Sequence, residues 1–175
     1  MKSSPRGFTI VELLIVIVVI GILAAITIVA FNGVQERSRT AKIQQDMRVF
    51  EQAINAARIT SGDVALRYVT LNTASGAPCW SMPSDTDLAA LPKNHSCWTT
   101  YANTLARISA ASGININNLV DPWGRPYYID ENEGESANPP TGCTADAIGY
   151  YSLPFTTAQT MTKYRLISKI QPACL

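Results

Sequence analysis

The chain has 175 residues and a formal net charge of +1, with 47% hydrophobic and 15% charged residues. This balance excludes a strong general attraction to nucleic acid or to an acidic surface, and the apolar content excludes a disordered chain. The length allows one modest globular domain beside an N-terminal apolar segment.

The N-terminal segment combines a glycine, a single acid and a long apolar run. Glu12 follows Gly7 by five residues, and no further charge occurs from Leu13 to Asn32. An apolar run of this length can cross a bilayer as a helix, where a carboxylate is costly unless it meets a partner. Cleavage between Gly7 and Phe8 would create an ammonium group on Phe8 one helical turn from Glu12. The two groups could then meet within one chain or between neighbouring copies.

Residues 6–40 closely resemble the N-terminal segment of type IV pilins and type II secretion pseudopilins. The resemblance implies that a membrane-embedded prepilin peptidase cleaves after Gly7 and methylates Phe8. It also implies that Glu12 neutralises the N-terminus of an adjacent subunit during filament assembly. One departure is Val29, which stands where many family members have a proline at which the helix partly melts in the filament.

Two simpler interpretations of the N-terminus compete with this one. A secretory signal peptide has a shorter apolar region and a small-residue cleavage site after it, and residues 32–36 do not fit such a site. An uncleaved membrane anchor fits the length of the run and the basic leader but leaves Glu12 unexplained.

The helix is expected to continue past the apolar run, because apolar residues recur at helical spacing and no proline occurs between residues 8 and 61. The stripe comprises Val34, Ala41, Ile43, Met47, Phe50, Ile54 and Ala57. We therefore predict a leader at 1–7, an apolar transmembrane or filament-core helix at 8–31, its amphipathic continuation at 32–61 and a globular head at 62–175.

The head is expected to be small and of mixed structure. Aromatic and β-branched content predicts antiparallel strands at Arg125–Ile129, Ala147–Leu153 and Lys163–Ile170. Thr99–Gly113 predicts a short helix with a cap and a glycine stop, and Ala65–Leu71 has the content of a strand or an ordered loop. The predicted fold class is α+β, a long N-terminal helix packed against a small antiparallel sheet. Type IV pilins share this plan.

Four cysteines, all in the predicted head, suggest disulfides in an exported domain. Of the three possible pairings we favour Cys79–Cys97 with Cys143–Cys174, because each closes a moderate loop without crossing the other. The second pair also resembles the C-terminal disulfide loop of many type IV pilins. Free buried thiols and a metal site remain alternatives, although no C-x-x-C spacing supports zinc.

The segment Asp121–Tyr128 predicts a tight turn that Trp123 pins to the core. It resembles the Asp-Pro-Trp-Gly segment of major type II secretion pseudopilins, in which a nearby loop binds calcium. The acids that follow it are candidate calcium ligands by this resemblance and by their oxygen chemistry: Asp130, Glu131, Glu133 and Glu135. Their spacing is not that of an EF-hand, and a solvated acidic turn is the alternative.

No motif indicates an enzyme. The single histidine, His95, lies two residues from Cys97, and this spacing by itself gives no general-base geometry. No cofactor other than the candidate calcium ion is expected, and the sequence contains no P-loop, nucleophile elbow or zinc-protease motif.

The function expected from the resemblance is that of a pilin, a structural subunit that polymerises through its N-terminal helix into a type IV pilus at the cell surface and supports adhesion, motility or DNA uptake. The expected partners are further copies of the chain, prepilin peptidase, membrane lipid before assembly, and the inner-membrane platform with its assembly ATPase. The expected location is the cytoplasmic membrane and then the extracellular filament. The alternatives are a type II secretion pseudopilin and an anchored binding module that does not polymerise.

Overall fold

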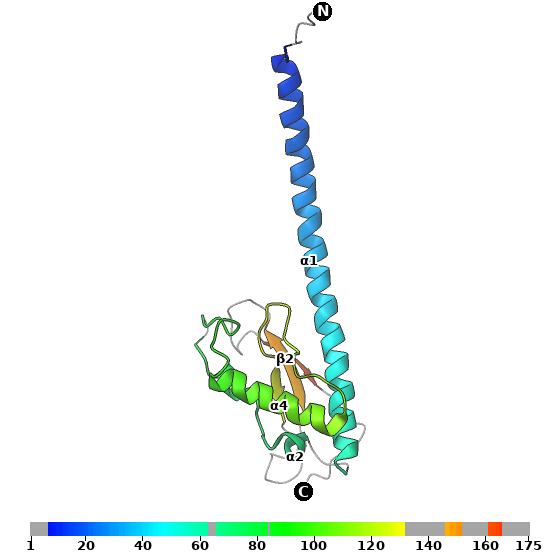
Figure 1. Ribbon diagram of the computed structural model, residues 1–175, viewed down its shortest axis with the longest axis vertical. Helices are drawn as coiled ribbons and strands as arrows, with labels where there is room; N and C mark the ends of the chain where they lie inside the picture. Colours follow the sequence, from blue (N-terminus) through cyan, green and yellow to red (C-terminus); the bar gives the residue numbers. More distant parts are fainter. Residues whose placement is uncertain (1–6, 63–65, 84, 132–145, 152–160, 166–175) are drawn as a thin grey trace, which may run out of the picture. The chain divides into compact units, whose positions relative to one another are not determined.

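The computed structural model describes residues 7–62, 66–83, 85–131, 146–151 and 161–165. These residues divide into two compact units, one ending at Ala41 and the other beginning at Lys42. The elements are the α1 helix at Ile10–Thr60, three shorter helices and three strands, which together make an α+β fold as predicted (Figure 1).

The first unit consists of the apolar part of α1. Every side chain that the structure describes from Phe8 to Ile28 is exposed, although nearly all are hydrophobic. A helix that is apolar on all faces is stable only when lipid or other protein covers it. Within the described residues, α1 is the one helix whose length and composition would allow it to cross a membrane.

The second unit is built on the amphipathic part of α1. Of the predicted stripe, Ile43, Phe50, Ile54 and Ala57 are buried, and Met47 packs against the same core. The core is completed by side chains from α2 (Leu66–Thr70), from α4 (Ser96–Ser112), from the segments before β1 and from the sheet. The buried members are Leu66, Trp98, Tyr101, Leu105, Ile108, Ile116, Tyr127, Ile129 and Ile148.

The sheet has three antiparallel strands in the order β1-β2-β3, namely Tyr128–Asp130, Ala147–Tyr151 and Met161–Arg165. Ile129 lies opposite Ile148 in the first pair, and Ile148 lies opposite Tyr164 in the second. Each strand overlaps the segment predicted for it, and β1 begins three residues later than expected.

The outer edge of β1 is paired with a non-helical segment that sequence patterns did not single out. The Gly76 N–H donates to the Ile129 carbonyl at 2.7 Å, and the Glu131 N–H donates to the Thr73 carbonyl at 3.2 Å. A Cβ at Gly76 would lie 2.1 Å from Cδ2 of the buried Tyr128 ring. Glycine is therefore needed for the close approach of this segment to the sheet.

Helix α4 begins earlier than predicted. We expected a cap at Thr99, but the cap is His95, whose Nδ1 accepts the Cys97 N–H at 3.2 Å. The predicted stop is confirmed, because Gly113 adopts φ 73° and donates to Ser109. A histidine cap is not among the common N-cap residues, so sequence preference alone did not indicate it.

The prediction for Ala65–Leu71 was wrong, because Leu66–Thr70 forms the short helix α2. Leu66 and Thr70 are four residues apart and both buried, and the Thr70 hydroxyl donates to the Leu66 carbonyl. Tertiary burial of one helical face thus overrode local strand content. Helix α3, Ala77–Trp80, was not predicted at all, since a helix of four residues has no detectable periodicity.

Candidate processing and assembly site

The start of α1 is organised by three hydrogen bonds between Thr9 and Glu12. The Thr9 hydroxyl accepts the Glu12 N–H at 3.2 Å, while a Glu12 carboxylate oxygen accepts the Thr9 N–H at 2.8 Å and the Thr9 hydroxyl at 2.7 Å. This is a capping box, in which a threonine and a glutamate three residues apart satisfy the first free N–H groups of a helix. Glu12 therefore has a partner in its own chain.

The capping box removes one objection to an uncleaved anchor. From the sequence alone such an anchor leaves Glu12 unexplained, but a carboxylate that caps the helix has a structural reason to be there. The T-x-x-E spacing could have indicated this from the sequence. The structure thus gives Glu12 a second candidate role beside assembly, and experiment must separate the two.

Among the residues that the structure describes, nothing requires Gly7 to be glycine. A Cβ added at Gly7 would meet no atom of these residues within 4 Å, and its backbone does not adopt a positive φ. Phe8 beside it is also exposed, at 73% of its maximum. The Gly7–Phe8 peptide bond is therefore accessible to another molecule, and glycine here is compatible with a requirement set by that molecule.

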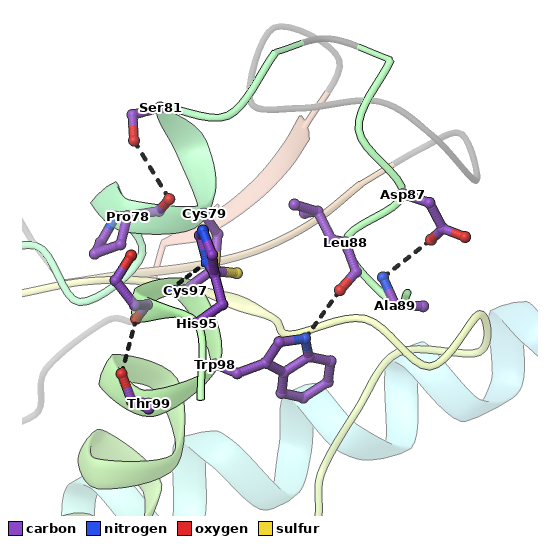
Figure 2. Close-up of a disulfide and its surroundings, with 11 residues drawn as sticks. Pro78, Cys79, Ser81, Asp87, Leu88, Ala89, His95, Cys97, Trp98 and Thr99 are labelled. Carbon is purple, nitrogen blue, oxygen red and sulfur yellow. Dashed lines mark hydrogen bonds between the residues drawn. A yellow bond between two sulfur atoms is a disulfide. The ribbon is translucent and has the colours of Figure 1, made fainter. Parts of the chain in front are cut away.

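The disulfide Cys79–Cys97 is formed, as favoured from the sequence, and it joins α3 to the first turn of α4 (Figure 2). Next to it, His95 caps α4 and Trp98 donates from Nε1 to the Leu88 carbonyl at 3.0 Å. Because its sulfur is in a disulfide, Cys97 is not available as a nucleophile. The predicted pair Cys143–Cys174 lies outside the described residues and stays a prediction.

The turn before β1 is held by an ion pair that was not predicted, beside the tryptophan that we expected to pin it. The Asp121 carboxylate accepts the backbone N–H groups of Trp123 and Arg125 and the Arg125 guanidinium, and both charged side chains are fully buried. Arg125 also donates to the Tyr151 carbonyl at 2.7 Å. Trp123 is only half-buried and lies against the Arg125 guanidinium.

The candidate calcium ligands divide between a buried pair and residues outside the described part. Glu131 is fully buried, and its carboxylate accepts the N–H and the hydroxyl of Ser75. Burial raises the pKa of Glu131 despite these donors. Asp130 is buried at the end of β1, so neither acid belongs to a solvated turn. Calcium ligation by Glu133 and Glu135 stays a prediction, and no metal-ligand cluster occurs among the described residues.

Two buried polar contacts between α1 and the rest of the second unit, among the described residues, were not predicted from the sequence. Tyr127 donates its hydroxyl to Asp46 at 2.6 Å, and burial together with this carboxylate raises the pKa of Tyr127 far above its usual range. Arg58 pairs with Asp146, and both side chains are buried. A charged residue directly after Ala57 on the apolar stripe was the available signal for a buried partner.

Comparison with known proteins supports the interpretation of the N-terminus. Residues 2–28 match the family model of the prokaryotic N-terminal methylation motif. The chain is 33% identical over 92 residues to the type IV major fimbrial protein FimA of Dichelobacter nodosus, which covers 50% of this chain and 58% of that protein. It is 38% identical over 55 residues to the type IV major alpha-pilin of Moraxella bovis, which covers 31% and 35%.

The chain therefore spans between 35% and 58% of the length of these two relatives. No solved structure matches it. The methylation motif and the fimbrial relatives show that the N-terminal part of the chain is similar to that of type IV pilins.

Proposed function

We propose that this chain is a pilus subunit that is cleaved between Gly7 and Phe8, methylated on Phe8 and polymerised through the apolar part of α1. The observation that carries the proposal is the exposure of this part of α1, in which every described side chain from Phe8 to Ile28 is exposed. Such a helix must be covered by lipid before assembly and by copies of itself afterwards.

In this proposal, burial of apolar surface between the α1 helices supplies the driving force for assembly. Burial of apolar surface is worth about 25 cal/mol per Å², so several hundred Å² on each subunit would contribute on the order of 10 kcal/mol before the costs of association. The polar groups at the helix start decide whether this gain can be realised. A charge transferred into an apolar filament core without a partner would offset it.

Glu12 is the residue that we assign to assembly. In the monomer its carboxylate is held by Thr9. Cleavage would supply an ammonium group on Phe8, and a neighbouring subunit would bring that group to Glu12 as it enters the filament. The charge pair would then neutralise both groups and set the axial register of the subunits.

Two substitutions of Glu12 separate this role from capping. Glutamine keeps the capping box, because the amide oxygen can accept the Thr9 N–H, but it removes the charge. Valine removes both. We expect Glu12→Gln and Glu12→Val to be inserted and cleaved normally and to reduce filament number equally, as counted by electron microscopy beside blots of mature protein. Glu36→Gln, which neutralises an exposed acid on the same helix, should assemble normally.

If Glu12→Gln makes normal filaments and only Glu12→Val fails, then capping and not charge is the requirement. If both variants assemble normally, Glu12 has no assembly role. The non-polymerising anchored binding module becomes the better proposal if wild type itself is processed and inserted but forms no filaments. The capping box is compatible with that module, because it gives Glu12 a role that needs no second subunit.

A type II secretion pseudopilin is the second candidate, favoured by the turn at Asp121–Arg125 that precedes β1. Both proposals require the peptidase, an inner-membrane platform and an assembly ATPase as partners, and both begin in the cytoplasmic membrane. They differ in the end point, since a pilus extends from the cell surface and a pseudopilus stays in the envelope. Labelling of intact cells with antibodies against the head separates them, because only a surface pilus is labelled.

A further inference from the structure

The turn of α1 that follows the apolar stretch carries two arginines, Arg37 and Arg39. Arg37 is exposed, and the Arg39 side chain is 40% exposed beside Glu36, with 3.8 Å between the charged atoms. We propose that these two arginines bind the phosphates of anionic phospholipids at the outer face of the membrane before the subunit is assembled. This inference rests on the proposed function, in which α1 spans that membrane.

Helix geometry places the backbone of both arginines just beyond the head-group layer, where their side chains can reach its phosphates. At about 1.5 Å per residue, Arg37 lies roughly 9 Å beyond Phe31, and Arg39 roughly 12 Å. Each head-group layer is about 5–7 Å thick. Helical side chains lean toward the helix N-terminus, which is the membrane side here, so the long arginine stems bring their guanidinium groups back to the phosphates.

The side chains of the two arginines also project from opposite sides of the helix. Two residues correspond to about 200° of rotation, so Arg37 and Arg39 project to nearly opposite sides and reach lipids on both. The next basic residue, Lys42, is used differently, since its ammonium group donates to Asp46 and to the Val120 carbonyl. The lipid contact is thus assigned to the arginines, whose planar guanidinium groups suit bidentate binding of phosphate.

Glu36 opposes this contact and therefore provides a test of opposite sign. Its exposed carboxylate repels an anionic head group and competes for Arg39. Neutralising Glu36 should strengthen the preference for anionic lipid, while neutralising the arginines should weaken it. A structural role of these residues in the helix would not produce opposite changes in lipid preference.

The test uses the full chain reconstituted in vesicles that contain phosphatidylcholine and phosphatidylglycerol. Spin-labelled forms of each lipid report, by electron paramagnetic resonance, which lipid contacts the protein. We expect wild type to prefer phosphatidylglycerol, and Arg37→Gln/Arg39→Gln to reduce that preference by about twofold or more. Glu36→Gln should increase the preference, and 0.5 M salt should reduce it in wild type. Arg48→Gln, an exposed arginine further along α1, should leave it unchanged.

An equal preference of wild type for the two lipids would overturn the proposal, as would an unchanged preference in the double arginine variant. Both results leave membrane anchoring and filament assembly untouched. Extraction of wild type from the vesicles by alkaline carbonate would instead contradict the anchoring step, and it would overturn the proposed function and this inference together.

Discussion

The buried pair Arg58–Asp146 gives a sharp test of how the second unit is held together. Both side chains are at most 1% exposed, and the residues are 88 apart in the sequence. Arg58 also donates to Asn55 at 3.4 Å. The second carboxylate oxygen of Asp146 has no hydrogen-bond partner among the described residues. Replacing Arg58 with methionine would therefore keep most of the buried volume and leave a buried carboxylate without its cation.

Loss of one partner from a buried ion pair costs about 3–5 kcal/mol, which is a large part of the typical 5–15 kcal/mol that stabilises a domain. We expect Arg58→Met to lower the free energy of unfolding by this amount. The double variant Arg58→Met/Asp146→Leu should recover most of the loss, because it removes the unpaired charge. Arg48→Met, at an exposed position on the same helix, should change stability by no more than about 0.5 kcal/mol.

Urea unfolding of the full chain in detergent provides the measurement. The three tryptophans, Trp80, Trp98 and Trp123, all lie in the second unit, so their fluorescence reports its unfolding. A loss of less than about 1 kcal/mol in Arg58→Met would refute the reasoning, because it would mean that the Asp146 carboxylate is solvated. A double variant less stable than either single variant would refute it as well.

Three further predictions concern processing, the second disulfide and pH. Gly7→Leu should leave the precursor uncut, whereas mass spectrometry of wild-type filaments should find a mature chain that starts at N-methylated Phe8. Peptide mapping without reduction should link Cys143 to Cys174, and replacement of both by serine should lower the free energy of unfolding by about 2–4 kcal/mol. Since burial raises the pKa of Glu131 above its unfolded value of 4.5, the stabilisation from this group is fully present below pH 4.5 and is lost as pH rises through the folded pKa. The unfolding free energy of Glu131→Gln should therefore increase relative to wild type as pH rises above 4.5.

Each of these predictions has a contrary result. Intact Met1 in assembled fibres would contradict processing, and four thiols that react with an alkylating agent in native protein would contradict both disulfides. A stability difference between Glu131→Gln and wild type that is independent of pH from 4 to 8 would mean that Glu131 titrates normally in the folded protein.

Much of the chain's architecture followed from patterns local in sequence. The run from Leu13 to Asn32 has one solution, a helix covered by lipid or protein, because a bare apolar helix is unstable in water. The stripe from Ile43 to Ala57 has the period of a half-buried helix, and the aromatic and β-branched runs that became β2 and β3 have the content of strands. These elements were predictable because each signal is repeated over many residues.

Other features depended on which residues, distant in the sequence, the fold places next to one another. Residues 66–70 have strand content, yet they form α2 because burial of Leu66 and Thr70 on one helical face outweighs a preference worth less than about 1 kcal/mol. Glu131 follows β1 and was a candidate calcium ligand, with a solvated turn as the alternative. In the structure the segment at Ser75 lies along that strand edge, and its N–H donates to the Glu131 carboxylate.

The candidate site at the start of α1 could be predicted from the sequence, whereas the buried ion pair of the second unit could not. The spacing from Gly7 to Glu12 and the resemblance that it carries are properties of the sequence, and so is the T-x-x-E pattern of the capping box. The pairing of Arg58 with Asp146 is not, because no local pattern selects one acid from the thirteen in the chain. Only the tertiary structure decides such a pair, since the energy that selects it arises when both charges leave water together.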